Sequence, residues 1–325
     1  LGLEFSESEN KIRLSIGSSK MPNNLYVYDL DDKSLVKLTN SLNPKIDSKN
    51  LVNAKVIRYK SFDGLEIPAI FYEPLQASKN NKVPALVWVH GGPGGQSRMG
   101  FNPLIQYLNN QGYAILAVNN RGSSGYGKTF YKLDDKNHGE NDLKDCLWGK
   151  KWLQELEYID AEKIGIIGGS YGGYMTMAAM TFTPDEFKVG VNIFGVTNWI
   201  RTLKSIPAYW EAGRKALYNE LGDPYSADSI RLKKISPLFH ANNIKNPVMV
   251  LQGANDPRVL QVESDEIVAE MQKNKVPLEY VVFDDEGHGF RKKENQLEGY
   301  RKIKEFLDYY LKELPEINLT KKMID

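Results

Sequence analysis

A Gly-x-Ser-x-Gly motif at residues 168–172 contains a serine that could act as a nucleophile. The motif follows an apolar run at 163–167 and precedes a helical pattern at 174–180. Such a strand–turn–helix context is typical of a nucleophile elbow, a sharp turn that lifts the serine hydroxyl above a sheet. Glycines are needed beside the serine because a Cβ there would clash with the neighbouring chain. The motif alone can arise by chance, so it is the context that predicts a catalytic Ser170.

A serine nucleophile needs a general base and an acid that orients the base, and two later loops offer them. In elbow-type hydrolases the acid precedes the histidine in sequence, and each lies in a loop that follows a strand. Asp256 follows the apolar run 248–251, and His288 follows the run 279–283. We expect Asp256 to hold one tautomer of His288, and His288 to take the proton from Ser170 and return it to the leaving group.

Other histidines and acids fit these two roles less well. The other three histidines are His90, His138 and His240. The first ends a strand beside glycines and is expected to shape a loop, whereas the other two follow no sheet strand and are expected to be ordinary surface or packing residues. Asp284 and Asp285 lie too close in sequence to His288 to orient it, and Asp223 is typical of a turn.

A second glycine-rich loop, at residues 90–95, follows the apolar run 85–89. Acyl transfer develops negative charge on the carbonyl oxygen, which backbone N–H groups must stabilise. One donor should be the N–H of Tyr171, directly after the nucleophile, and we assign the second to Gly92. Glycine-rich loops also bind phosphate, but the G-x-x-x-x-G-K-[ST] pattern is missing and no helix begins directly at these glycines, which disfavours a phosphate site.

The elements that must position these loops follow from the apolar pattern. Short runs that are apolar at almost every position occur at residues 85–89, 113–118, 163–167, 189–194, 248–251 and 279–283. Such runs are typical of parallel strands buried on both faces, and helical periodicity between them, as at 140–156 and near the C-terminus, supplies the covering helices. The pattern therefore predicts an α/β-hydrolase fold with a mostly parallel, doubly wound sheet and helices on both faces.

The N-terminal part has a different pattern. Residues 25–30 and 35–38 flank a polar turn and predict a β-hairpin, and a second hairpin is predicted around Asp63-Gly64. We therefore divide the chain into a hairpin arm with its linker, the hydrolase domain with a helical insertion, and a C-terminal tail. Their expected bounds are 1–50 for the arm and linker, 51–315 for the domain, about 198–235 for the insertion and 316–325 for the tail.

The composition excludes several functional classes. Hydrophobic residues make up 41% and charged residues 26% of the 325 residues, which is typical of a globular chain. Because 42 Lys+Arg balance 41 Asp+Glu, we expect neither nucleic acid nor a membrane surface as a partner. The single cysteine, Cys146, excludes an internal disulfide and a thiolate metal cluster. With no signal peptide visible we expect a cytoplasmic protein, and its oligomeric state is not readable from the sequence.

Five motifs together resemble the catalytic domain of the prolyl oligopeptidase family, with the acylaminoacyl-peptidase-like branch most similar. They occur in family order over about residues 52–312: His90-Gly-Gly-Pro93, Asn119-Asn-Arg-Gly-Ser-Ser-Gly-Tyr-Gly127, Gly168-Gly-Ser-Tyr-Gly-Gly-Tyr174, Gly253-Ala-Asn-Asp-Pro-Arg-Val259 and Glu286-Gly-His-Gly-Phe290. Members are serine peptidases of short peptides, and many also hydrolyse activated esters. The resemblance implies the same catalytic triad and oxyanion donors as above, and it implies no metal or organic cofactor.

The resemblance also implies a primary specificity pocket. Residues placed like Val196, Trp199 and Val259 line it in relatives, although ordinary core packing is the alternative. An apolar pocket would favour a hydrophobic or aromatic residue before the scissile bond. Asn198 and His138 stand where relatives often carry Asp and Trp, which leaves the fine specificity open. Arg121 could bind a substrate carboxylate or, as the preferred alternative, brace a loop.

The N-terminus departs from the family pattern. Family members carry a β-propeller before the hydrolase domain, and residues 25–38 resemble the closing strands of its last blade. One hairpin cannot bury its apolar face alone or close a propeller. We therefore expect the chain to be a fragment of a longer parent; a shortened hydrolase that keeps the hairpin as an arm is the alternative.

The expected function is a serine hydrolase that acts through an acyl-enzyme on short peptides, in the manner of an acylaminoacyl or dipeptidyl peptidase. A carboxylesterase acting on small acyl or aryl esters with the same triad is the first alternative, because a peptide amine leaves less readily than an alkoxide or phenolate and needs stricter positioning. The second alternative is a catalytically silent binding module with a hydrolase fold.

Overall fold

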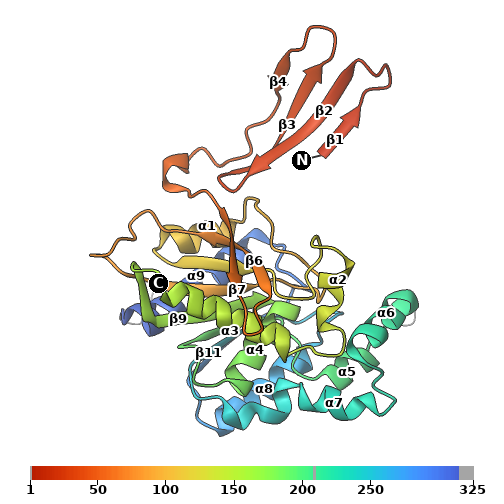
Figure 1. Ribbon diagram of the computed structural model, residues 1–325, viewed down its shortest axis with the longest axis vertical. Coiled ribbons are helices and arrows are strands. Elements are labelled where there is room, and N and C mark those ends of the chain that lie inside the picture. The colour runs from red at the N-terminus through yellow and green to blue at the C-terminus, as the bar shows by residue number, and fades with distance from the viewer. Residues whose placement is uncertain (1, 208–209, 315–325) are drawn as a thin grey trace, which may run out of the picture.

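The computed structural model describes residues 2–207 and 210–314 (Figure 1). The C-terminal tail expected at 316–325 lies outside the described residues. Among the described residues, no helix is both long enough and apolar enough to cross a membrane.

An eight-stranded sheet forms the centre of the protein, with the strand order β12-β11-β10-β9-β7-β8-β6-β5. Its strands are β5 (Lys55–Lys60), β6 (Glu66–Tyr72), β7 (Val83–Val89), β8 (Ala114–Val118), β9 (Ile159–Gly169), β10 (Gly190–Ile193), β11 (Val248–Gly253) and β12 (Leu278–Phe283). All neighbours from β8 through β12 pair in parallel, whereas β5 and β6 pair antiparallel. The six apolar runs therefore became the six parallel strands, and the predicted α/β-hydrolase fold is confirmed.

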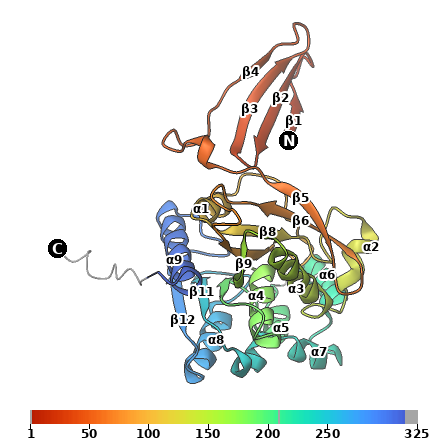
Figure 2. The ribbon, with the colours of Figure 1, turned by 60° about the vertical axis from the view of Figure 1, so that its left-hand side comes forward.

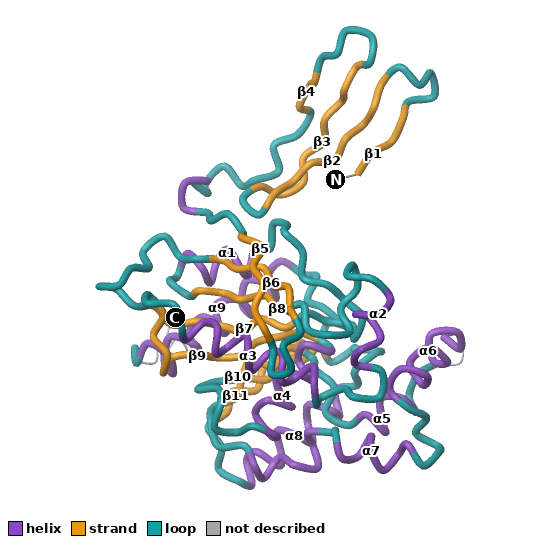
Figure 3. Tube along the Cα trace, in the orientation of Figure 1, coloured by secondary structure: helices purple, strands orange, loops and turns teal. Residues whose placement is uncertain are grey.

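Helices cover both faces of this sheet (Figures 2 and 3). They are α1 (Pro103–Asn110), α2 (Lys128–Tyr131), α3 (Asn141–Gln154), α4 (Tyr171–Phe182), α5 (Trp199–Lys204), α6 (Glu211–Leu221), α7 (Asp228–Lys234), α8 (Gln261–Lys273) and α9 (Lys293–Lys312). Side chains of β8 alternate between two apolar clusters: Leu116 belongs to one cluster with residues of α3, α4 and α8, and Ile115 to the other with residues of α1 and α9. This period of two explains why the strand is apolar at every position.

The N-terminal part contains more strands than the sequence suggested. Four strands, β1 (Gly2–Phe5), β2 (Lys11–Ser18), β3 (Met21–Asp29) and β4 (Leu35–Lys37), form an antiparallel sheet that stands apart from the hydrolase body (Figures 1 and 2). The predicted hairpin is β3–β4, and two further strands, β1 and β2, precede it in the same sheet. Ile12, Leu14 and Ile16 alternate with polar residues, which is a half-buried strand pattern in a segment that is otherwise polar.

One glutamine joins this sheet to the hydrolase body. Gln106 of α1 is buried, and its amide donates to the backbone oxygens of Ser19 and Val52 at 2.7 and 2.9 Å. Its side-chain oxygen accepts the Val52 N–H at 3.1 Å, and Ser19 Oγ accepts the N–H of Ala54 at 3.0 Å. The turn between β2 and β3 is thus fastened to the first helix of the hydrolase.

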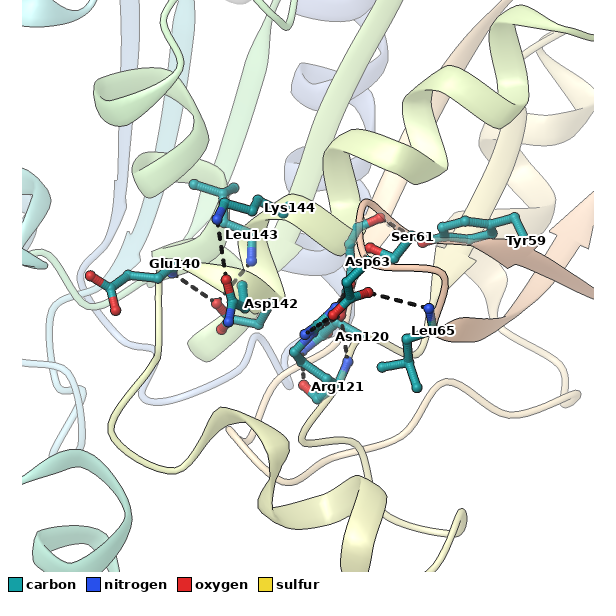
Figure 4. Close-up of polar contacts among 12 residues, drawn as sticks. Tyr59, Ser61, Asp63, Leu65, Asn120, Arg121, Glu140, Asp142, Leu143 and Lys144 are labelled. Carbon is teal, nitrogen blue, oxygen red and sulfur yellow. Dashed lines mark hydrogen bonds and ion pairs between the residues drawn. The ribbon is translucent and has the colours of Figure 1, made fainter.

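Arg121 braces the loop that follows β8 (Figure 4). Its guanidinium donates to Asp145 of α3 at 2.8 and 2.9 Å and to Asp63 of the β5–β6 turn at 3.0 Å. Asp145 is fully buried and also accepts the Arg121 backbone N–H at 2.8 Å and the Ser61 hydroxyl at 2.6 Å. Of the two roles considered for Arg121, the structure shows loop bracing, because the side chain is only 5% exposed and held by two carboxylates.

Replacing Arg121 with Met should lower the free energy of unfolding by about 3–5 kcal/mol, because Asp145 would remain buried without a countercharge. Urea unfolding followed by circular dichroism measures this loss. The matched control is Arg301→Met, which removes a partly exposed ion pair with Glu298 and Glu305 on α9 and should change stability by about 1 kcal/mol or less. Equal losses in the two variants would contradict the bracing role.

Candidate active site

Ser170 occupies a strained turn between β9 and α4. Its backbone has φ 56° and ψ −118°, a conformation that residues with a Cβ rarely adopt. The turn is packed so tightly that a Cβ at Gly172 would lie 2.0 Å from the carbonyl oxygen of Val89. The Ser170 N–H donates to the carbonyl oxygen of Ile193 at 2.9 Å, which ties the turn to the end of β10. The expected elbow is therefore present, and it presents a serine at its apex.

Three side chains predicted for the catalytic chemistry are brought together. His288 Nε2 lies 2.9 Å from Ser170 Oγ, and His288 Nδ1 lies 2.7 Å from Asp256 Oδ2. Asp256 follows β11 and His288 follows β12, while Ser170 follows β9. Because these strands run parallel in one sheet, their carboxyl ends meet at one edge, which is where open α/β sheets bind ligands. The sheet order thus brings three loops that are distant in sequence together, so that their side chains are joined by two hydrogen bonds.

Asp256 and His288, the predicted acid and base, are both held by neighbouring groups. The Asp256 side chain is fully buried, and its second oxygen accepts the N–H groups of Arg258 and Val259 at 2.8 and 3.0 Å. The ring of Phe194 packs on the His288 ring with centroids 4.8 Å apart. The carboxylate therefore cannot turn away from the imidazole, which fixes the ring orientation that Ser170 meets.

The loops that carry Asp256 and His288 are also fastened to each other. The N–H of Asn255 donates to the backbone oxygen of Glu286 at 2.9 Å, and a Cβ at Gly253 would lie 2.4 Å from the carbonyl oxygen of Gly287. The buried Glu286 carboxylate accepts the N–H groups of Arg291 and Lys292 at 2.9 and 2.8 Å. This close approach explains why a glycine stands at position 253, three residues before Asp256.

The two predicted oxyanion donors lie in the elbow and in the loop that passes beside it. Tyr171 begins α4 directly after Ser170, and Gly92 lies in the loop after β7. A Cβ at the neighbouring Gly91 would lie 3.4 Å from Ser170 Cβ, so this loop passes directly against the nucleophile. Both backbone N–H groups stay predicted donors.

His90 shapes the loop after β7, as expected. Its Nδ1 lies 2.8 Å from the backbone oxygen of Gly91, and its Nε2 lies 2.8 Å from the Ser123 hydroxyl. Burial lowers the pKa of His90, which favours a neutral ring. The histidine therefore links two loops at the strand ends and does not compete with His288 as a base.

The Tyr171 side chain fixes the start of α4 through a hydrogen bond to Asp142, a residue that the sequence analysis did not identify. Its hydroxyl donates to the carboxylate of Asp142 at 2.5 Å. Asp142 lies in the first turn of α3 and accepts the N–H groups of Glu140 and Leu143 (Figure 4). Burial raises the pKa of Asp142 to about 6, even though the nearby His138 and Tyr171 oppose this shift. The available signal was its position on the apolar side of the predicted helix at 140–156.

The residues predicted to line a pocket belong to the buried wall beside the elbow. Val196, Trp199 and Val259 are 3–4% exposed and lie in the same apolar cluster as Tyr171. The Trp199 ring packs on the Tyr171 ring with centroids 6.1 Å apart. Burial in this cluster is equally compatible with the packing alternative, so their role as pocket residues stays a prediction.

A buried carboxylate fixes the loop that carries this wall. Glu263 of α8 accepts the backbone N–H groups of Thr197 and Asn198 at 3.0 and 2.6 Å, and the Thr202 hydroxyl at 2.9 Å. Asn198 in turn caps α5 by accepting the N–H of Arg201. Sequence reasoning missed Glu263 because nothing local distinguishes it from the exposed acids of the same helix.

His138 lies in a charged cluster and is not an ordinary surface or packing residue. It is fully buried, with Nε2 located 3.3 Å from Asp134 Oδ2 and 3.7 Å from Glu220 Oε1. Burial lowers the pKa of His138, but the two carboxylates outweigh it and raise this pKa to about 9. The spacing of Asp134 and His138, four residues apart, was the available signal. By contrast, His240 packs edge-on against a phenylalanine, as expected.

Comparisons with known proteins agree with this architecture. A sequence profile of the prolyl oligopeptidase family matches residues 99–314. Dipeptidyl aminopeptidase BIII of Pseudoxanthomonas mexicana is 38% identical over 289 residues, covering 87% of this chain and 42% of that protein. Dipeptidyl peptidase family member 6 of Caenorhabditis elegans is 36% identical over 330 residues, covering 92% of this chain and 43% of that protein. The chain therefore spans less than half the length of these relatives.

A solved structure gives the same picture. The acylaminoacyl peptidase of Pyrococcus horikoshii superposes with a TM-score of 0.84 at 28% identity. The superposition covers 97% of this chain and 50% of that one. Because 97% of the chain is covered, the likeness extends from the hydrolase body to strands of the N-terminal sheet.

The strain at the elbow gives a stability test. Ser170→Gly and Ser170→Ala both remove the hydroxyl, but the observed φ and ψ strain alanine and not glycine, so Ser170→Gly should be more stable by about 1 kcal/mol in urea unfolding. Ser236, at φ −90° and ψ 114°, is the control; there the glycine variant should be less stable than the alanine variant by about 0.5–1 kcal/mol. The same order at both sites would exclude strain at Ser170.

The buried Asp142 gives a pH test. Its pKa of about 6 in the folded state exceeds the ordinary value of 3.8, so the folded state binds more protons between these two values. The stability that Asp142 contributes is therefore present below about pH 4 and lost as the pH rises through 6. Unfolding of the wild type and of Asp142→Asn should show their stability difference shifting against the wild type by on the order of 2 kcal/mol across this window. A constant difference would contradict the shift.

Proposed function

The chain belongs to the prolyl oligopeptidase family, and from this premise we propose that it is a serine hydrolase that cleaves short peptides through an acyl-enzyme. The observation that carries the proposal is the continuous hydrogen-bonded chain from Ser170 through His288 to the buried Asp256. A serine, a histidine and a carboxylate in this order activate the hydroxyl as a nucleophile.

In the first half-reaction, Ser170 Oγ attacks the scissile carbonyl carbon while His288 Nε2 takes the hydroxyl proton. Asp256 stabilises the imidazolium that forms. The N–H groups of Tyr171 and Gly92 donate to the oxyanion. When the tetrahedral intermediate collapses, the C–N bond breaks, His288 returns the proton to the leaving amine, and the acyl group stays on Ser170. Water then repeats the sequence and releases the acid.

The substrate proposal is a short peptide or blocked amino acid from which a small N-terminal unit is released. It is supported by two relatives that are named as dipeptidyl peptidases and by the structural similarity to an acylaminoacyl peptidase. The wall formed by Val196, Trp199 and Val259 is apolar and packed in one buried cluster with Tyr171. We propose that it receives a hydrophobic or aromatic side chain on the acyl side of the scissile bond, where each methylene contributes about 1–3 kcal/mol to discrimination.

Hydrolysis of three chromogenic substrates tests this proposal: a dipeptidyl anilide, an acyl-aminoacyl anilide, both with an aromatic residue before the anilide, and a short-chain nitrophenyl ester. We expect anilide turnover that falls at least about 10³-fold in Ser170→Ala. Ser34→Ala, in the turn between β3 and β4, is the control and should retain full activity. Ester turnover without anilide turnover would instead indicate a carboxylesterase.

Labelling with a fluorophosphonate separates the enzyme from a silent hydrolase fold. We expect one label per chain in the wild type and in Ser34→Ala, and none in Ser170→Ala, because only a serine activated by a base reacts with this reagent. Mass spectrometry of the labelled peptide identifies the residue. A wild-type chain that stays unlabelled would contradict the proposed function.

A further inference from the structure

Three potential metal ligands converge beside the elbow and have no part in the proposed acyl transfer. Asp134 ends the short 3-10 helix Lys132–Asp134, His138 lies four residues further on, and Glu220 lies in the last turn of α6. One ligand atom from each lies within 4.8 Å of the others. Figures 1 and 2 both show α6 beside α2, the helix that leads into Asp134.

Five buried polar atoms of this cluster have no hydrogen-bond partner in the part of the chain that the structure describes. Both carboxylate oxygens of Asp134, both ring nitrogens of His138 and one oxygen of Glu220 are buried without a partner among the described residues. The side chains of Asp134 and His138 are 0% exposed. Buried polar groups in native proteins are nearly always hydrogen-bonded, because leaving them unpaired is costly. One of these atoms from each residue faces the other two within 4.8 Å, which is the arrangement expected of groups whose partner is an ion.

The contact geometry supports the same conclusion. His138 Nε2 and Asp134 Oδ2 are 3.3 Å apart, so the direction of the contact, and not its length, prevents a hydrogen bond. Lone pairs that point at a shared ion do not point at each other. Ligands bound to Zn²⁺ at 2.0–2.2 Å in a tetrahedron lie about 3.4 Å apart. The two separations from His138 Nε2, 3.3 Å to Asp134 Oδ2 and 3.7 Å to Glu220 Oε1, are near this spacing, and the two carboxylate oxygens lie within 4.8 Å of each other.

The donor set identifies the class of ion. An imidazole nitrogen with two carboxylate oxygens suits Zn²⁺ and similar first-row transition metals, whereas Ca²⁺ and Mg²⁺ prefer oxygen ligands alone. Asp134 is fixed, since a Cβ on Gly122 would lie 1.8 Å from its Oδ2. Glu220 is the partly exposed member, at 13%, so a small movement of its carboxylate can close the site and provides an entry path.

We propose that Asp134, His138 and Glu220 bind one divalent transition-metal ion, with Zn²⁺ as the best fit, and that this ion clamps α6 to the loop before α3. The clamp would act next to the nucleophile, because the His138 ring contacts the Tyr171 ring edge-on with centroids 5.7 Å apart. One backbone hydrogen bond already joins the same segments, from the Lys136 N–H to the Glu220 carbonyl at 2.7 Å. The site does not depend on the chemistry proposed for Ser170.

Calorimetric titration of the EDTA-treated full chain with Zn²⁺ tests the proposal, together with thermal unfolding at each metal concentration. The wild type should bind one ion per chain and unfold at a higher temperature with Zn²⁺, but not with Ca²⁺ or Mg²⁺. Glu220→Gln keeps the shape of the side chain and should weaken binding at least about tenfold, and His138→Phe should abolish it. Circular dichroism of each variant verifies that it is folded.

Two control variants test whether the heat of Zn²⁺ binding comes from this cluster. Glu140→Gln changes a nearby carboxylate that pairs with Lys234 at 3.3 Å, outside the cluster, and should bind Zn²⁺ like the wild type. His288→Gln should also retain the site, which excludes binding at the candidate active site. The proposal is overturned if the wild type binds no Zn²⁺, or if Glu220→Gln and His138→Phe bind it as tightly as the wild type does; the cluster would then be an ion triad of His138 with two carboxylates.

Discussion

The hydrogen bond from Ser170 to His288 joins residues 118 positions apart, and the rest of the architecture is arranged so that it can form. It requires the ends of β9 and β12 to face the same edge of the sheet, with β10 and β11 between them in parallel. It also requires the Ser170 backbone to stay in a conformation that disfavours a side chain. The cost of that strain is tolerated because Gly168, Gly172 and their neighbours let the surrounding backbone close in on the turn.

Buried carboxylates fasten the loops around this edge. Each accepts at least one backbone N–H from a loop or helix start near the site, and the members are Asp142, Asp145, Asp256, Glu263 and Glu286. A carboxylate that accepts backbone N–H groups makes stronger hydrogen bonds than a neutral acceptor, and it holds a loop without adding another secondary-structure element. The donors and acceptors of the site are therefore positioned before any substrate arrives, which is the arrangement that electrostatic stabilisation of a transition state requires.

The sequence predicted the parts of the site that depend on local pattern. The elbow, the two later loops and the parallel strands follow from glycines beside short apolar runs, since backbone conformation and burial leave a local imprint. The buried charges leave none: Glu263 contacts a residue 65 positions away, and only the folded chain shows that it is not a surface acid. The first two strands were missed for a related reason, because the alternation of Ile12, Leu14 and Ile16 with polar residues is short, and only pairing with neighbouring strands shows it to be a strand.

Tyr171 contacts the candidate active site, the apolar wall beside the elbow and the charged cluster at His138. Its backbone N–H is the donor proposed for the oxyanion, its ring packs on Trp199 in the wall beside the elbow, and its hydroxyl is held by Asp142. The same ring contacts His138, which links it to α6 through Glu220. A change in the wall or in the charged cluster should therefore displace the Tyr171 backbone, whose N–H is the proposed oxyanion donor, so we expect substrate preference and rate to vary together. Coupling of this kind follows from dense packing, because a rigid interior transmits small displacements to its neighbours.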